Sequence, residues 1–482
     1  MKQQAQNSRQ RSKPLHGMRF IDWAANMLRY ASAAFIFLIP ILFVYINKIQ
    51  KGYYIDEKFH VPQTMKYCAG NITEWDSKIT TFPGLYIVTA LYLGPLELCT
   101  TIFMRFVNVI LTLGNLGLCL TLVSTICQER INRDPQVKYL NVYLSAWNIA
   151  FFPPLFFYFC FYYTDVLSTT MVLAMLLSHV KKNYKMTALM GAFAIIARQT
   201  NVVWLAYLAI ENSLTFVEEY TKRPELTRSL NISRIIKTIY AILSAKARIG
   251  LSAFGDFVGP LCKLILPHVI VLLVFFIFVI YNGGIVVGDK SAHQPTIHLA
   301  QLLYFSVFVF IFAWPYILPH FRNFVQFLYK NILLSSILLG SITLIVQFNT
   351  LVHPYILADN RHYSFYIWKN FMNRDPAYKF IPVPFYALFI YSIVKTLSSM
   401  RLLSLVAYLL CTSFVLIPQL LLEPRYFIVP YIIFRLKQSN IKNWQIVCET
   451  LTTMFVILAQ FALFSFKSFS WSDEEHPQRI GW

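Results

Sequence analysis

The sequence predicts an all-α, polytopic membrane protein with about thirteen transmembrane helices, within a range of roughly 12 to 14. Hydrophobic residues make up 57% of the 482 residues, whereas charged residues make up only 13%. The mean hydropathy of +0.53 is too high for a pair of soluble domains. The apolar residues are also gathered into runs of roughly 15 to 22 residues, the length at which a helix spans the hydrocarbon core of a bilayer.

Short polar segments separate these apolar runs. In chain order the runs lie near residues 31–48, 85–126, 140–160, 166–180, 186–198, 201–216, 264–281, 299–318, 332–352, 381–394, 402–422, 426–434 and 445–466. The run at 85–126 is long enough for one span and an interfacial helix. The run at 426–434 is the shortest, and if it is re-entrant, the residues that follow it change sides of the membrane.

The distribution of charge predicts the orientation. With the N-terminus in the cytosol, about two thirds of the 42 Lys and Arg residues fall on the cytosolic side, in agreement with the positive-inside rule. We therefore interpret the net charge of +20 as a signal of membrane orientation and predict no nucleic-acid partner. The same orientation places more than half of the 22 Asp and Glu residues on the far, lumenal side, together with the glycosylation sequon at Asn71.

The spans are predicted to form one membrane domain, because the sequence shows no internal repeat, low-complexity tract or soluble domain. We predict a cytosolic tail at residues 1–30, a membrane domain at 31–470 and a tail at 471–482. Within the membrane domain we predict lumenal loops at 49–84 and 353–380 and a cytosolic loop at 217–263. The first apolar run has no small-residue cleavage site after it, so we interpret it as an uncleaved span.

The eight cysteines show no CxxC pair and no metal-ligand spacing, and most lie in or beside apolar runs. We therefore predict no disulfide framework. Two short motifs, Glu57-x-x-His60 and Asp359-x-x-His362, each resemble half of a carboxylate–histidine metal site. Two such matches in a long chain are weak, and we predict neither a metal nor another cofactor.

The polar segment from Tyr53 to Tyr86 is the most informative stretch of the chain. It gathers five ionisable residues between two apolar runs, namely Asp56, Glu57, His60, Glu74 and Asp76. Ionisable groups beside a bilayer are costly unless they face water, a partner or a substrate. We therefore predict that this loop is a catalytic centre.

Asp56 and Glu57 are adjacent, so their side chains point in different directions, and we expect one to carry chemistry and the other to orient it. In a helix His60 lies three to four residues after both carboxylates, where a hydrogen bond from imidazole to carboxylate is sterically easy. The alternative interpretation is that Asp56 caps a short surface helix and that Glu57 and His60 are solvated.

Five further clusters lie on the predicted lumenal side. They are Tyr162–Asp165, Arg198–Asn201, Asn282–His298, Leu357–Tyr363 and, if the last spans are counted correctly, Glu423–Tyr426. Guanidinium groups offer a planar fork of donors to phosphate oxygens, so we predict a phosphate site formed by basic side chains of these segments. The candidates are Arg361, His362, Lys369 and Arg425. The alternative is that Arg361 pairs with Asp359 and that Arg198 and Arg425 extend to the membrane interface.

A second set of side chains is predicted to bind the sugar or acceptor. It comprises His60, Trp75, Tyr86, Asp165, Arg198, Asp359, Tyr363 and Tyr366. The aromatic members can stack on sugar rings, although an interfacial aromatic belt explains them equally well.

Several runs of residues resemble those of a known family. They are Asp56-Glu57-x-Phe59-His60-x-Pro62-Gln63, Tyr67-Cys68-x-Gly70, Ile79-Thr80-Thr81-x-Pro83-Gly84-Leu85-Tyr86, Arg198-Gln199-Thr200-Asn201, Asn282-Gly283-Gly284-Ile285-Val286, Leu357 to Tyr363, Leu421-Leu422-Glu423-x-Arg425-Tyr426-Phe427 and Arg479-x-x-Trp482. Together they are similar to the dolichyl-phosphate-glucose-dependent alpha-1,2-glucosyltransferases of the endoplasmic reticulum, in the GT-C superfamily. Two residues depart from the expected pattern: Lys58 stands where an apolar residue is expected, and Ser77 where proline is expected.

The resemblance implies a GT-C membrane enzyme with a helical first lumenal loop, in which the catalytic base falls on Asp56 or Glu57. It implies dolichyl phosphate glucose as donor and a dolichyl-diphosphate-linked oligosaccharide as acceptor, both embedded in membrane lipid. The enzyme would add the terminal glucose of the N-glycan precursor at the lumenal face of the endoplasmic reticulum membrane.

Three alternative functions are compatible with a polytopic membrane protein. One alternative is another dolichyl-phosphate-sugar transferase, such as a mannosyltransferase. A multispan transporter would show internal repeats and paired broken helices in two halves, and the sequence shows neither. A membrane scaffold or channel regulator would not depend on lumenal carboxylates.

Overall fold

Helices make up most of the described chain. The computed structural model describes residues 15–133, 142–222, 232–290, 295–472 and 474–482. Within these ranges every apolar run predicted from the sequence contains a helix, which confirms the all-α fold class. The described strands, β1 (Ser468–Phe469) and β2 (Gln478–Arg479), form a short antiparallel pair.

The α-helices follow the apolar runs in order. Their bounds are α2 (Leu15–Ile49), α3 (Glu57–Cys68), α4 (Gly84–Leu93), α5 (Thr101–Arg133), α6 (Val142–Ala150), α7 (Pro153–Phe156), α8 (Thr164–Val180), α9 (Tyr184–Ala197), α10 (Val202–Thr221), α12 (Ile232–Ile249), α13 (Leu251–Asn282), α14 (Ala300–Ile317), α15 (Phe321–Lys330), α16 (Ile332–Phe348), α17 (Pro354–Ala358), α18 (Tyr363–Ile367), α19 (Val383–Thr396), α20 (Leu402–Leu416), α21 (Ile428–Lys437) and α22 (Asn443–Phe466).

Five helices of the described chain are long and apolar enough to cross a membrane alone, and a bent pair, α6 with the segment Pro153–Cys160, raises the number to six. Further apolar helices of 10–17 residues lie between them. The prediction of about thirteen spans counted these shorter helices as well. That number remains a prediction.

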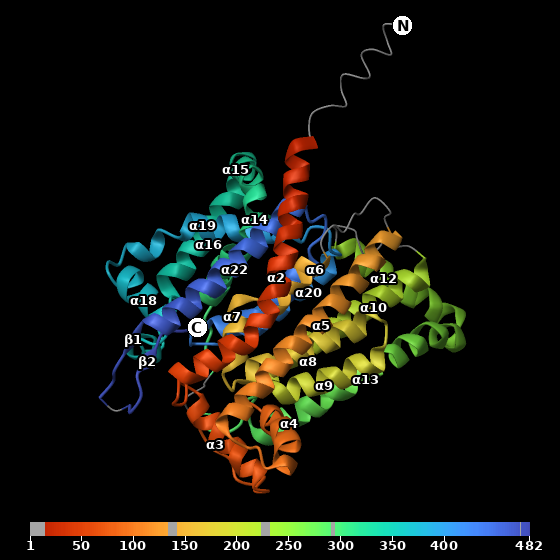
Figure 1. Ribbon diagram of the computed structural model, residues 1–482. Helices are drawn as coiled ribbons and strands as arrows, with labels where there is room; N and C mark the ends of the chain where they lie inside the picture. Colours follow the sequence, from red (N-terminus) through yellow and green to blue (C-terminus); the bar gives the residue numbers. More distant parts are fainter. Residues whose placement is uncertain (1–14, 134–141, 223–231, 291–294, 473) are drawn as a thin grey trace.

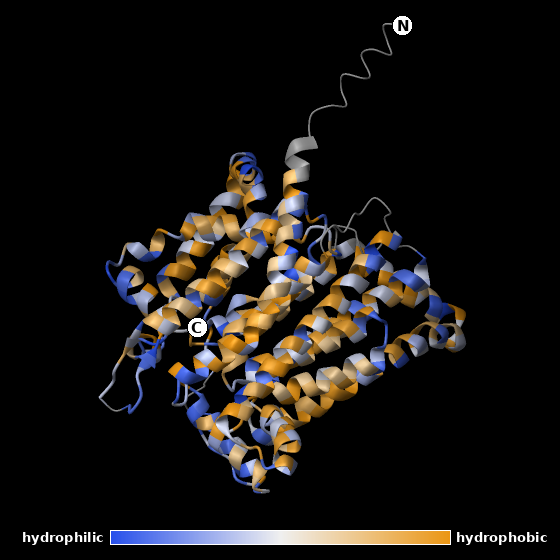
Figure 2. Cartoon of the chain, viewed as in Figure 1, coloured by the Kyte–Doolittle hydropathy of each residue, from blue (hydrophilic) through white to orange (hydrophobic). Residues whose placement is uncertain are grey.

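The helices lie side by side in two groups (Figure 1). In one group α5, α8, α9, α10 and α13 contact one another in succession, and in the other α14, α16, α19 and α22 lie together. The loop that contains α3 and α4 closes one end of the first group. Hydrophobic residues cover the helix bodies, whereas hydrophilic residues gather at α3, at the β1–β2 pair and at the tip of α15 (Figure 2).

A buried aromatic segment between α6 and α8 forms the centre of the core. Two prolines start α7, where the missing N–H groups cost nothing, and the chain then leaves the helical conformation at Phe161. Buried irregular backbone needs hydrogen-bond partners. The side-chain amide of Asn108 donates to the carbonyls of Phe161 and Tyr163, at 2.7 and 2.9 Å.

Helices and a strand extend into segments that were predicted from the sequence to be tails or loops. Helix α2 begins at Leu15, within the predicted tail 1–30, whose first fourteen residues lie outside the described residues. Helices α12 and α13 occupy much of the predicted loop 217–263, whose residues 223–231 lie outside the described ranges. The predicted tail 471–482 folds back onto the domain through β2 and Trp482, apart from position 473, which is not described.

The prediction of no disulfide framework is wrong for one pair. Cys68, the last residue of α3, is bonded to Cys99, which lies just before α5, with a Cα–Cα distance of 6.5 Å. The two residues are 31 positions apart, so no spacing rule signals the bond. The packing of α3 against α4 brings them together.

Candidate active site

The Asp56 carboxylate lies at the entrance of α3 but does not cap it. The backbone of Asp56 takes the N-cap position, and its side chain makes no capping hydrogen bond. Instead, Asp56 Oδ2 lies 3.1 Å from Arg425 Nη1, and 32% of the Asp56 side chain remains exposed. The Asp56 N–H donates to Tyr163 Oη at 3.0 Å. The half-exposed carboxylate therefore stays within reach of a second molecule.

Glu57 occupies a contrasting environment, because its side chain is fully buried. Both of its oxygens bind Arg105 of α5: Oε1 accepts from Nε at 2.9 Å and Oε2 from Nη2 at 2.5 Å. The carboxylate also accepts the backbone N–H groups of Tyr54 and Tyr162, at 2.8 and 2.7 Å. Four donors leave Glu57 no free position for a substrate proton, which suits an orienting role.

Arg105 ties the first loop to the helix bundle. Besides binding Glu57, its guanidinium donates to the carbonyls of Gln50 and Gly52 at 3.0 and 2.9 Å. An arginine inside an apolar run is costly unless it is paired. The position of Arg105 inside an apolar run is the sequence signal that indicates a buried partner. Its pairing with Glu57 was not predicted from the sequence.

The predicted hydrogen bond between His60 and a carboxylate is absent from the described residues. His60 Nδ1 instead lies 2.6 Å from Tyr86 Oη, and the imidazole packs edge-on against Tyr163. Burial lowers the pKa of His60, and the neighbouring charge of Arg425 acts in the same direction, so these effects outweigh the opposing charge of Asp56. His60 is therefore a neutral, hydrogen-bonded wall residue at neutral pH.

Arg425 forms the centre of a charged cluster. Its guanidinium lies 3.1 Å from Asp56, 3.7 Å from Asp165 and 2.7 Å from Glu423. The Arg425 side chain is only 13% exposed, so its guanidinium is enclosed among these carboxylates. Burial would raise the pKa of Asp56, but the positive charge of Arg425 and the nearby imidazoles outweigh it and hold that pKa below the ordinary 3.8.

Asp165 and Arg198 complete this cluster. The two side chains form an ion pair, and the Arg198 guanidinium lies over the ring of Tyr426 at 5.5 Å. The cluster thus joins four predicted segments: the first loop, the start of α8, the end of α9 and the segment before α21. Glu423 was predicted as part of the fifth lumenal cluster but not as a site residue, although it stands two residues before Arg425.

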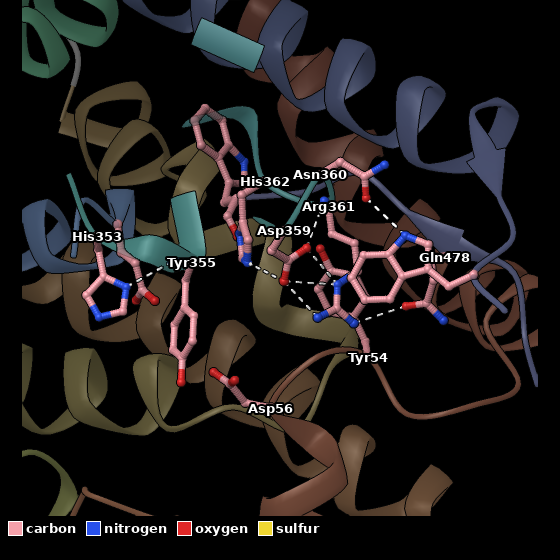
Figure 3. Close-up of polar contacts among 12 residues, drawn as sticks. Tyr54, Asp56, His353, Tyr355, Asp359, Asn360, Arg361, His362 and Gln478 are labelled. Carbon is pink, nitrogen blue, oxygen red and sulfur yellow. Dashed lines mark hydrogen bonds and ion pairs between the residues drawn. The ribbon is translucent and has the colours of Figure 1, made fainter. Parts of the chain in front are cut away.

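A second cluster contains Asp359, Arg361 and His362. Arg361 donates to Asp359 through Nε and Nη2, at 2.9 and 2.7 Å, and through Nη1 to Gln478 Oε1 at 3.1 Å (Figure 3). Its guanidinium also stacks on the Trp471 ring at 4.5 Å. The structure therefore shows the alternative arrangement, in which Arg361 pairs with Asp359 and its donor fork is occupied.

His362 lies between the two clusters. Its Nε2 is 3.6 Å from Asp359 Oδ2, and its Nδ1 is 3.2 Å from the main-chain oxygen of Trp482. Figure 3 draws no contact between Asp56 and this second cluster. The His362 side chain is 23% exposed, so part of the imidazole remains accessible.

The other predicted site residues are spread over the loops. Trp75 Nε1 donates to the Ile79 carbonyl at 3.1 Å, and its ring packs against Tyr86, which is fully buried and has no face open to a sugar. Tyr363 packs against Trp482 at 4.9 Å. Tyr366 is half-buried, and Lys369 is exposed with its ammonium over the ring of Phe365. Asn71 lies on the half-exposed loop beside Glu74.

The residues of the two predicted half metal sites are engaged by other groups. Glu57 binds Arg105 and His60 faces Tyr86, whereas Asp359 binds Arg361. Among the residues described here, no three His, Cys, Asp or Glu side chains gather in an arrangement suited to a metal ion.

The loop after α13 closes over the first loop. The N–H of Asp289 donates to the carbonyl of Ser77 at 2.7 Å, and that of Val287 to the carbonyl of Thr80 at 3.3 Å. Gly288, at φ +75°, has no room for a Cβ against the Ser77 and Ile79 carbonyls. Positions 291–294 of this predicted cluster lie outside the described residues.

A cavity of about 800 Å³ lies at the opposite end of the same helices. Arg105 of α5 contacts the first loop, whereas Arg130, near the other end of α5, lines this cavity. The buried carboxylate of Glu211 lines this cavity and is paired with Arg401 and Lys437, each at 3.0 Å. The cavity is therefore separate from the Asp56 cluster.

Known proteins resemble this chain over almost its whole length. The DIE2/ALG10 family model matches residues 50–436. The chain is similar to curated proteins named Dol-P-Glc:Glc(2)Man(9)GlcNAc(2)-PP-Dol alpha-1,2-glucosyltransferase. The Rattus norvegicus protein is 34% identical over 461 residues, covering 92% of this chain and 96% of the relative. The Homo sapiens protein is 32% identical over 459 residues, with the same coverage, and the Arabidopsis thaliana protein is 32% identical over 526 residues, covering 94% and 99%. No solved structure matches this chain.

Proposed function

The chain belongs to the DIE2/ALG10 family, and from this premise we propose that it transfers glucose from dolichyl phosphate glucose to a dolichyl-diphosphate-linked oligosaccharide, forming an alpha-1,2-glucosidic bond. The name of these relatives describes this donor and an acceptor that already carries two glucoses. The observation that carries the proposal in this chain is the half-exposed carboxylate of Asp56 in the charged cluster around Arg425.

The reaction is a single displacement. A beta-linked donor and an alpha-linked product require inversion at the anomeric carbon, so one base suffices. The 2-hydroxyl oxygen of the acceptor glucose attacks the anomeric carbon, its proton passes to Asp56, and the glucosyl–oxygen bond breaks with its electron pair leaving on the phosphate. A positioned general base contributes on the order of a hundred- to ten-thousand-fold in rate.

The geometry favours Asp56 over Glu57 as that base. Asp56 is partly exposed and accepts from a single arginine, whereas Glu57 is buried and accepts from four donors. A base must come within hydrogen-bond reach of the proton that it removes. We therefore propose that Asp56 reacts with the acceptor and that Glu57 holds the loop in place.

The leaving dolichyl phosphate needs positive charge rather than an acid. Arg361 is occupied by Asp359 and Gln478, so we propose that Arg425 and the accessible imidazole of His362 stabilise the departing phosphate. A phosphate bound to Arg425 would replace one carboxylate contact of this guanidinium with a charge-assisted contact of its own.

The protein is proposed to act in the endoplasmic reticulum membrane with Asp56 on the lumenal side. The excess of Lys and Arg in the other loops supports this orientation. The disulfide between Cys68 and Cys99 also supports it, because disulfides persist in oxidising compartments and not in the cytosol.

A transfer assay tests the proposal. Purified enzyme is given a lipid-linked oligosaccharide that carries two glucoses, with labelled dolichyl phosphate glucose or dolichyl phosphate mannose as donor. We expect label transfer from the glucose donor, and a loss of about a hundredfold or more in Asp56→Asn. Transfer from the mannose donor alone would assign a mannosyltransferase, and near-normal rates in Asp56→Asn would remove Asp56 from the reaction.

A further inference from the structure

Residues 478–482 run between the two charged clusters, and we call this segment the strap. Its first two residues form β2, which pairs with β1. The guanidinium of Arg479 donates to the carbonyls of Phe464 and Ser465, both at 2.8 Å. These carbonyls belong to the last turn of α22, where helix acceptors lack partners. The strap is thus anchored to the end of α22 before it enters the interior.

The strap holds the backbone of the Asp359–His362 cluster. The N–H of Gly481 donates to the Arg361 carbonyl at 2.8 Å, and the Gly481 carbonyl accepts from the Tyr363 N–H at 3.3 Å. The side chain of Gln478 receives Nη1 of Arg361 at 3.1 Å (Figure 3). Three contacts from one short segment therefore fix both the backbone and the side-chain direction of Arg361.

The strap also reaches the wall that holds Asp56. The main-chain oxygen of Trp482 accepts from Tyr158 Oη at 2.9 Å and lies 3.2 Å from His362 Nδ1. The Tyr158 ring packs against Tyr163 at 4.7 Å, and the Tyr163 hydroxyl receives the N–H of Asp56. The main-chain oxygen of Trp482 thus connects His362 with Tyr158, which packs on the tyrosine that holds the backbone of Asp56.

Gly481 is where the strap passes closest to the first loop. A Cβ built on it would come within 3.0 Å of Tyr54 Oη and of the Phe157 ring. Its φ is not in the left-handed region, so glycine is required for space and not for conformation. Tyr54 stands two residues before Asp56, and a displacement at Gly481 is therefore passed directly to the first loop.

The ring of Trp482 fixes the depth of the strap. It packs against Tyr363 at 4.9 Å and Phe312 at 6.0 Å, and its Nε1 donates to the side chain of Gln460. These contacts come from α18, α14 and α22. The ring therefore connects α14 and α22 of one helical group with the segment that begins at Tyr363.

We propose that the strap positions His362 and Arg361 relative to the Asp56 loop, with Gly481 and Trp482 as positioning residues of the glucosyl transfer. This inference rests on the proposed function. The strap residues need not touch substrate, because they act through Arg361, His362 and Tyr54. Misplacement of reacting groups by about 1 Å can lower a rate about a hundredfold, so the strap should affect turnover more than substrate binding.

The test compares Gly481→Ala with Gly340→Ala in the purified full-length enzyme. A Cβ on Gly340, an exposed position of α16, meets no other atom within 4 Å. We expect Gly481→Ala to lower kcat for glucose transfer about ten- to a hundredfold, with KM for donor and acceptor changed less than about threefold, and Gly340→Ala to match the wild type. Thermal unfolding of each variant reports on its fold.

A second substitution separates positioning from general damage. Removing the Tyr54 hydroxyl relieves one of the two contacts that a Cβ at Gly481 would violate. We expect Gly481→Ala with Tyr54→Phe to recover part of the kcat lost in Gly481→Ala, measured against Tyr54→Phe alone. Wild-type kcat in Gly481→Ala, or a double variant no faster than Gly481→Ala, would overturn the proposal.

Two further outcomes are distinguishable. If Gly481→Ala does not accumulate as folded enzyme, Trp482→Phe and Trp482→Ala replace it. The strap then predicts a graded loss of kcat, with the phenylalanine variant retaining more activity, and equal kcat in both overturns it. An inactive wild type contradicts the proposed function, whereas an active wild type with an equally active Gly481→Ala contradicts only the strap.

Discussion

Glu57 and Arg105 form a closed ion pair, with Oε2 and Nη2 2.5 Å apart and neither side chain more than 2% exposed. The pair joins the residue beside the proposed base to the start of α5. The buried Glu57 anchors the backbone of the first loop and so keeps Asp56 facing Arg425. The carboxylate of Asp56 itself stays accessible to a second molecule.

Breaking this pair should unfold the loop. Removal of one partner from a buried ion pair costs about 3–5 kcal/mol, because the other charge is left uncompensated. We expect Glu57→Gln and Arg105→Met each to lower the midpoint of thermal unfolding well below that of Asp56→Asn, whose site is half-exposed. Equal stability of Glu57→Gln and Asp56→Asn would contradict the anchoring role of Glu57.

The pH dependence of transfer should change when Arg425 is replaced. The folded pKa of Asp56 lies below 3.8, so Asp56 stays deprotonated, and active as a base, until the pH falls below that value. The stabilisation from its ion pair is likewise present above pH 3.8 and is lost as the pH falls through the folded pKa. In Arg425→Met burial acts without the compensating charge and the pKa rises.

We therefore expect kcat/KM of Arg425→Met to fall on the acid side at a higher pH than the wild type does. Rates measured from about pH 3 to pH 8 in both proteins check this shift, and Lys369→Met, at an exposed position, is the control for loss of one positive charge elsewhere. If kcat/KM falls at the same acid pH in Arg425→Met and in the wild type, Arg425 does not control the pKa of Asp56.

The helices could be predicted from the sequence, and the first loop could be proposed as a candidate site, because both signals are local. A helix that crosses a membrane needs a continuous apolar run, and a loop of carboxylates between two such runs stands out. The closeness of Asp56 to Arg425, and the contacts of the strap with Arg361 and Tyr158, could not be predicted. These contacts join residues from opposite ends of the chain, and no periodicity within one segment encodes them.

Local reasoning also gave the wrong partner for His60. Spacing along α3 places the imidazole on the side of the carboxylates, but spacing cannot show that Tyr86 from α4 lies closer. The same limit applies to Arg361, for which the sequence left two partners open and the structure selects Asp359. Residue types were thus predictable where their pairings were not.

The disulfide between Cys68 and Cys99 should stabilise the first loop. It closes a segment of 31 residues, and such a crosslink contributes about 2–4 kcal/mol, mainly by restricting the unfolded chain. We expect a reductant to lower the thermal midpoint of the wild type and to have no such effect on Cys68→Ser with Cys99→Ser. Cys262→Ser, at an exposed free thiol, is the control and should respond like the wild type.

Gly288 should be intolerant of any side chain, because two independent requirements meet there. Its φ of +75° lies in the left-handed region that L-residues with a Cβ rarely adopt, and a Cβ would approach the Ser77 and Ile79 carbonyls within 3.0 Å. Backbone carbonyls of a hydrogen-bonded turn cannot rotate aside as a flexible side chain would.

Gly288→Ala must therefore pull the loop after α13 away from the first loop. We expect faster proteolytic cleavage within residues 77–80 and lower transfer activity in this variant. Gly114→Ala, where a Cβ meets no atom within 4 Å, should keep the wild-type cleavage pattern. Unchanged protection in Gly288→Ala would mean that the two loops do not depend on this contact.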